Sequence, residues 1–226
     1  NLPPKPTFLK AVKLAKYQTF SLKNGLKIYF MEDHKLPTVS YFLYLDYFPT
    51  LEKNKSGLGE ITTRLMKQGA GKRDKAKIDE ELDFMGTDFS IEDNLIYASS
   101  LKKYASQSLE IFSDIIKSPK FEESELAKVK EEMLSEIQSE KQNPNSLLSN
   151  VAKSILYPNS HPYSEIPTEK TVEKITIKDC SSYHKIYFKP NIAHLAITGD
   201  ITLDDAKLLV EAHFSNWQPG EVPQFK

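Results

Sequence analysis

Alternating and helically spaced hydrophobic positions divide most of the chain into short strands and amphipathic helices. Residues 17–31 alternate around Asn24-Gly25, a dipeptide typical of a tight β-hairpin turn. Residues 38–46 form a nearly continuous run of apolar, β-branched and aromatic side chains, which predicts a strand buried on both faces. Further strands are predicted at residues 87–91, 95–101 and 192–199.

Helical spacing of apolar residues marks the segments between these strands. Within residues 122–142, Leu126, Val129 and Met133 recur every three or four positions and predict the buried side of a long charged helix. The other helices are predicted at residues 56–68, 75–85, 103–117, 146–156, 178–187 and 203–213. This order predicts an α+β fold in which helices pack on one face of a largely antiparallel sheet.

Proline placement sets the expected domain limits. Residues 1–16 contain three prolines within the first six positions and predict an extended N-terminal segment. Residues 17–217 hold all the periodic segments and predict one globular domain. Residues 218–226 contain Pro219, Gly220 and Pro223, and they predict a linker that leads out of the domain towards an absent second half.

Composition narrows the class of protein. The 226 residues carry 30 Lys and Arg against 31 Asp and Glu, a balance that argues against a nucleic-acid-binding protein. No apolar run approaches the ~20 residues that a membrane-spanning helix needs. Cys180 is the only cysteine, so it forms neither an internal disulfide nor a cysteine-rich zinc site. No two of the five histidines have the spacing of metal ligands along one helix.

Several short motifs occur in a recognisable order. They are Asn24-Gly-Leu-Lys-Ile28, the segment from Gly57 to Gly69, Ser135-Glu-Ile137, His161-Pro-Tyr163, Tyr187-Phe-Lys-Pro-Asn191 and Ile197-Thr-Gly-Asp200. Together they resemble the amino-terminal half of the pitrilysin/insulinase family of zinc peptidases, of the mitochondrial processing peptidase-like kind. The resemblance covers about residues 17–215.

The resemblance implies where a zinc site would lie. The family carries His-x-x-Glu-His on the helix after the third strand, with two zinc-binding His residues and a Glu as general base. With Gly57 and Gly69 as fixed points, the first His corresponds to Glu60, the general base to Thr63 and the second His to Arg64. The family's distal Glu ligand corresponds to Glu136, and a second acid seven residues earlier corresponds to Val129.

The replaced residues change the chemistry expected at this site. Arg has no lone pair for a metal ion, and Thr is not a general base near neutral pH. We therefore expect no catalytic residue, no metal ligand and no bound cofactor in this chain. We expect the Arg64 guanidinium to take the place of the metal charge between Glu60 and Glu136, because a buried Glu136 without a cation would be costly.

The resemblance implies a non-catalytic, pseudo-peptidase subunit that encloses an unfolded peptide beside a homologous, zinc-bearing partner. The peptide would pair with an edge of the sheet. Two alternatives remain: an active zinc metalloendopeptidase with an atypical site, and a structural subunit of a larger complex. The resemblance also points to the periplasm or cell envelope of a bacterium.

Overall fold

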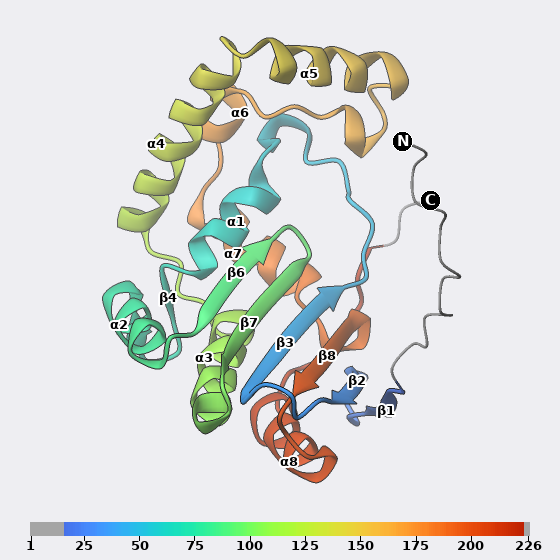
Figure 1. The fold of residues 1–226 in the computed structure, drawn as a ribbon. Coiled ribbons are helices and arrows are strands. Elements are labelled where there is room, and N and C mark those ends of the chain that lie inside the picture. The colour runs from blue at the N-terminus through green and yellow to red at the C-terminus, as the bar shows by residue number, and fades with distance from the viewer. Residues whose placement is uncertain (1–15, 224–226) are drawn as a thin grey trace, which may run out of the picture.

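The computed structural model describes residues 16–223, which form a mixed α+β fold (Figure 1). Within these residues, the main sheet has six strands in the order β1-β2-β8-β3-β7-β6. The strands are β1 (Gln18–Ser21), β2 (Lys27–Glu32), β3 (Thr38–Leu45), β6 (Asp88–Glu92), β7 (Leu95–Leu101) and β8 (Ala193–Gly199). All neighbouring pairs are antiparallel except β2 and β8, so the predicted fold class is confirmed.

The predicted hairpin at the start of the domain is present and also ties the two ends of the domain together. Gly25 adopts a φ of +93°, and the Asn24 side chain accepts a hydrogen bond from the Leu26 amide. The same side chain donates to the carbonyls of Phe214 and Trp217, at 2.7 and 2.9 Å. Residues 1–15 of the predicted extended segment and residues 224–226 of the predicted linker lie outside the described part.

The prediction that residues 38–46 are buried on both faces is wrong. Along β3, Tyr41 and Leu43 are fully buried, whereas Phe42 and Tyr44 are 36% and 43% exposed. Helices cover only one face of the sheet, so alternate side chains of β3 point to different environments. The aromatic residues on the open face look like core residues in the sequence, which explains the error.

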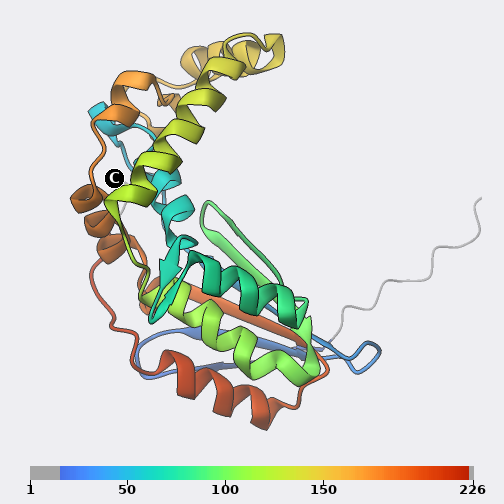
Figure 2. The same ribbon diagram turned by 90° about the vertical axis from the view of Figure 1, so that its left-hand side faces the viewer.

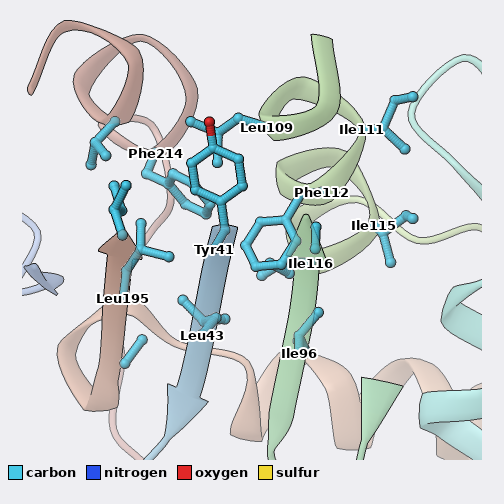
Figure 3. Packing of buried hydrophobic residues seen from close by; sticks show 14 of the residues in the cluster. Tyr41, Leu43, Ile96, Leu109, Ile111, Phe112, Ile115, Ile116, Leu195 and Phe214 are labelled. Atoms are coloured by element: carbon cyan, nitrogen blue, oxygen red, sulfur yellow. The ribbon is translucent and has the colours of Figure 1, made fainter. Parts of the chain in front are cut away.

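The covered face carries the main hydrophobic core. Tyr41 packs against Phe112 with ring centroids 6.0 Å apart (Figure 3), and its hydroxyl donates to the Ala105 carbonyl at 3.1 Å. The helices that contribute to this core include α2 (Lys75–Met85), α3 (Ala105–Lys117) and α8 (Leu203–Phe214). The core therefore joins strands and helices from both ends of the sequence.

A second apolar cluster lies among helices beyond the ends of the strands. It includes Ile61, Leu65, Leu126, Val129, Met133 and Cys180. The helices are α1 (Leu58–Met66), α4 (Glu123–Glu140), α6 (Glu169–Glu173) and α7 (Ile177–Tyr187). Figure 2 shows α4 leading away from the sheet towards α5 (Pro144–Leu156). Burial raises the pKa of the Cys180 thiol to about 11, so this thiol is not ionised at neutral pH.

Three small elements were not predicted. Strands β4 (Gly69–Ala70) and β5 (Arg73–Asp74) form a two-stranded sheet, and α6 is a single short helix. Elements this short leave no periodic pattern in the sequence. The chain after α1 thus continues directly into the first strand of this small sheet. Between residues 16 and 223, none of the helices is both long and apolar enough to cross a membrane.

Candidate functional site

Helix α1 carries three of the four predicted site positions, and a half-buried carboxylate, that of Glu52, fixes where it begins. Oε2 of Glu52 accepts hydrogen bonds from the amides of Gly57 and Leu58, and Oε1 accepts one from Gly59 at 2.7 Å. A carboxylate at this helix end also interacts favourably with the helix dipole. Burial raises the pKa of Glu52, and its hydrogen bonds from the backbone oppose that shift.

Arg64 joins α1 to α4 as the sequence predicts. Its Nη1 donates to Oε1 of Glu136 at 2.9 Å, and its Nη2 donates to Oε2 of Glu136 at 2.6 Å. Nη2 also donates to Oε1 of Glu60 at 2.5 Å. The hydrogen bond from Arg64 lowers the pKa of Glu136, and the same bond raises the pKa of Arg64. The predicted position of Arg64 between the two carboxylates is confirmed.

The expected burial of this cluster is wrong. The Glu136 side chain is 53% exposed and that of Glu60 is 43% exposed, while Arg64 is 29% exposed. Water therefore screens the charges. Because Glu136 is exposed, it does not need the Arg64 cation to offset the cost of burial. The Arg64 guanidinium nevertheless binds the Glu136 carboxylate through two parallel hydrogen bonds, and this bidentate contact fixes the spacing of α1 and α4.

Thr63 and Val129 offer no proton-transfer group in this structure. Thr63 is 8% exposed, and its hydroxyl donates to the Glu60 carbonyl of its own helix at 2.9 Å. Val129 is 2% exposed and lies in the apolar cluster between α1 and α4. Both positions therefore serve packing.

The residues present do not fit a zinc ion of the family type. Within residues 16–223, no group of three or more His, Cys, Asp or Glu side chains is arranged to hold a metal ion. The nearby carboxylates, Glu60 and Glu136, are already bound by a guanidinium that has no lone pair to offer. The correspondence of Glu60, Thr63, Arg64 and Glu136 to the family's zinc-site positions stays a prediction.

A cleft of about 590 Å³ lies beside α1, and sequence reasoning missed most of its lining. Glu60 and Thr63 form part of one wall, and Tyr44 and Asp46 at the end of β3 form part of another. Its aromatic and proline lining residues are Tyr44, Tyr47, Phe48, Pro49, Pro162, Tyr163, Pro167 and Tyr183. These residues come from segments far apart in the sequence, so no local pattern could have marked them.

The charged residues that line this cleft are all acidic. They are Asp46, Glu52, Glu60, Asp93 and Glu165, and no Lys or Arg of the described part of the chain joins them. Glu52 and Glu165 accept hydrogen bonds from backbone amides. Asp46 and Asp93 make no ion pair within the described chain. The cleft is therefore negatively charged next to a wall of tyrosine rings.

An edge strand lies beside the same helix. In the order of the main sheet, β6 is terminal and pairs with β7 alone among the described strands. Figure 1 shows β6 and β7 extending next to α1. The outer side of β6 thus presents backbone groups that can pair with a further strand.

Comparison with known proteins identifies two matching family profiles. The profile described as Insulinase (Peptidase family M16) matches residues 50–166, and the one described as Peptidase M16 inactive domain matches residues 174–226. The chain is 26% identical over 212 residues to the beta subunit of mitochondrial-processing peptidase from Bos taurus, covering 89% of this chain and 43% of that protein. It is 24% identical over 183 residues to a protein called a non-peptidase homolog from Helicobacter pylori, covering 78% of this chain and 42% of that protein.

Solved structures show the same fold. A peptidase M16 inactive domain from Pseudomonas fluorescens matches with a TM-score of 0.82 and 25% identity, over 93% of this chain and 53% of that chain. The periplasmic protease PqqL from Escherichia coli matches with a TM-score of 0.78 and 18% identity, over 93% of this chain and 25% of that chain. The chain spans about half the length, or less, of the curated relatives named above. Because the insulinase profile matches more than half of its residues, the chain belongs to the insulinase-type peptidase family M16.

Proposed function

We propose that this chain is part of a non-catalytic subunit that binds an extended peptide beside a zinc-bearing, homologous partner. The observation that carries the proposal is that the Arg64 guanidinium binds both Glu136 and Glu60, the two carboxylates that we align with metal-binding positions of the family. A cation fixed there competes with Zn²⁺ for the same carboxylates. The relative described as a non-peptidase homolog supports the idea that the family contains such proteins.

The cleft and the edge strand support peptide binding. An extended peptide that pairs with β6 would add a strand to the sheet next to α1. Its side chains would then reach the cleft lined by Asp46 and Asp93, where positive charge is favoured and tyrosine rings offer cation–π contacts. We therefore propose that the bound peptide is unfolded and rich in Lys or Arg.

The partner and the location belong to the same proposal. Relatives include both the beta and the alpha subunits of mitochondrial-processing peptidase, which supports a two-subunit assembly with a second peptidase-family chain. The bacterial envelope is the proposed location, supported by the similarity of fold to a periplasmic protease.

The first experiment tests for catalysis. Zinc content and peptide cleavage would be measured on this chain alone, and again after mixing with a co-encoded subunit that carries His-x-x-Glu-His. We expect no stoichiometric zinc in this chain and cleavage only in the presence of the partner. About one zinc per chain together with unaided cleavage would overturn the proposal in favour of an active peptidase with an atypical site.

A second experiment tests peptide binding separately. A fluorescently labelled Lys-rich peptide and a Glu-rich peptide of equal length would be titrated with the chain and followed by anisotropy. We expect the Lys-rich peptide to bind more tightly, and the double variant Asp46→Asn/Asp93→Asn to lose that preference. The matched control is Asp204→Asn, because Asp204 is 91% exposed on α8 and does not line the cleft. Equal binding of both peptides would contradict the acidic cleft as the peptide site.

A further inference from the structure

A separate cavity of about 360 Å³ lies where three helices end. Helix α3 ends at Lys117, α7 at Tyr187 and α8 at Phe214, and residues at or just past each end line the cavity. It shares no lining residue with the acidic cleft beside α1. Whatever it binds is therefore independent of the proposed peptide site.

The charge of this cavity is entirely positive. Lys117, Lys185 and Lys189 line it, and among residues 16–223 no Asp or Glu does. By contrast, the cavity around Arg73 has three carboxylates that bind its one guanidinium. An excess of cations in a concave site is the arrangement that attracts an anion.

One of the three lysines already has partners. The Lys117 ammonium donates to the His213 carbonyl near the end of α8 and to Oδ1 of Asn216. A cation is favourable at a helix C-terminus, so the fold itself accounts for Lys117. Lys185 lies in the last turn of α7 and Lys189 just past its end, where the helix dipole also favours a cation. Unlike Lys117, however, neither of these two lysines forms a hydrogen bond or an ion pair through its ammonium group within residues 16–223.

The remaining lining is uncharged and combines aromatic rings with small polar side chains. Trp217 is 6% exposed and donates through Nε1 to the Phe188 carbonyl at 3.2 Å. The Phe188 ring stacks on His184 with centroids 4.7 Å apart, and His184 donates through Nε2 to the Ile116 carbonyl at 2.8 Å. Burial lowers the pKa of His184 to about 4, so its ring is neutral at pH 7 and acts as an apolar surface.

We propose that this cavity binds a phosphate monoester, with its phosphate between Lys185 and Lys189 and its organic group against Phe188 and Trp217. A phosphate monoester carries about −1.5 to −2 charges at neutral pH and three acceptor oxygens. Two unpaired ammonium groups and the hydroxyls of Ser118 and Ser181 supply more donors than the two oxygens of a carboxylate would use. The cavity volume lies within the range of small-ligand sites.

The chain offers a built-in reporter for this site, because Trp217 is its only tryptophan. Phenyl phosphate and inorganic phosphate would be titrated into the full chain at constant ionic strength, with tryptophan fluorescence as the readout and calorimetry as the second measurement. We expect saturable binding of phenyl phosphate, with inorganic phosphate weaker because it lacks the ring. The double variant Lys185→Met/Lys189→Met should weaken binding at least about tenfold. Each substitution removes an ammonium group that would donate to the phosphate, and the loss of one such charged hydrogen bond lowers affinity by about this factor.

The control variant is Lys178→Met, which removes an exposed lysine from the same helix but not from the cavity. It should bind phenyl phosphate as the unchanged chain does. The proposal is overturned if fluorescence does not saturate, if Lys178→Met loses as much affinity as the double variant, or if benzoate binds as tightly as phenyl phosphate. The first two outcomes would leave only general charge attraction, and the third would exclude phosphate as the recognised group.

Discussion

Arg64 on α1 binds Glu136 on α4 through both terminal guanidinium nitrogens, at 2.9 and 2.6 Å, across 72 positions of sequence. The two helices otherwise meet through apolar side chains, so this pair is the charged part of their contact. Its geometry is that of a planar, two-point fit, which a single ammonium group cannot reproduce.

Arg64→Met should therefore lower the free energy of unfolding modestly. We expect a loss of about 1 kcal/mol at low salt, because the three side chains are partly exposed and the interaction is screened. The loss should shrink in high salt, where the surrounding ions screen the same charges. Urea unfolding at two salt concentrations measures both effects. Lys128→Met, which removes an exposed ion pair on α4, is the control. A loss no larger than that of the control would contradict a role for the bidentate fit.

Restoring the family residues should restore metal binding. In the triple variant Glu60→His/Thr63→Glu/Arg64→His, two imidazoles one turn apart would face Glu136, which supplies a third ligand. We expect about one zinc per chain by elemental analysis after dialysis. Adding Glu136→Gln to the triple variant should remove most of that zinc. If the triple variant binds none, the position of the degenerate site has been misassigned.

Arg73 should matter more for stability than Arg64. Its side chain is 18% exposed and binds Glu81 at 2.7 Å, Asp114 at 2.8 Å and Glu110 at 3.0 Å. Arg73→Met would leave three carboxylates together with only the more distant Lys77, 3.9 Å from Glu81, as a nearby cation, which we expect to cost about 2–3 kcal/mol of unfolding free energy. Chemical denaturation measures the loss. Lys75→Met, one residue outside β5 and paired only with exposed Asp79, should change stability by less than about 0.5 kcal/mol.

His34 gives the folded state a pH dependence of known sign. Hydrogen bonds to Asp200 first and Glu32 second raise the pKa of His34 above 6.5. Its stabilising interaction is therefore fully present below pH 6.5 and is lost as the pH rises through the higher folded-state pKa. Nuclear magnetic resonance titration of the imidazole should show this raised pKa.

The two partners of His34 can be separated by substitution. Asp200→Asn should lower the pKa of His34 further than Glu32→Gln does, because Asp200 is the larger cause of the shift. A His34 that titrates at or below 6.5 in the unchanged chain would contradict the bridged geometry seen here.

Local patterns in the sequence predict the regular elements well, because each depends on residues that are neighbours in the chain. Asn24-Gly25 marks the first hairpin, and the helix predicted at residues 75–85 is α2, which ends at Gly86 with a φ of +60°. The contact of Arg64 with Glu136 was also foreseen, but only from the family resemblance. Periodicity alone carries no information on which helices meet.

The failures share one physical cause, which is that burial depends on distant parts of the chain. Nothing near Phe42 in the sequence reveals that helices cover only the opposite face of β3. The exposure of Glu136 likewise depends on the position of α4, which leads away from the sheet (Figure 2). The acidic cleft joins Tyr44, Asp93 and Glu165, whose proximity exists only in the folded chain.

The parallel pair of β2 and β8 has a consequence for how the domain forms. β8 lies between β2 and β3, yet among the strands of residues 16–223 it comes last in the sequence. Until residue 199 is available, the β1–β2 hairpin and the β3–β7–β6 group have no strand between them. The sheet can therefore close only after β8 has been synthesised, through contacts that are distant in sequence and slow to form. A nascent chain interrupted before β8 would hold two separate sheet fragments with unpaired inner edges, a form prone to aggregation.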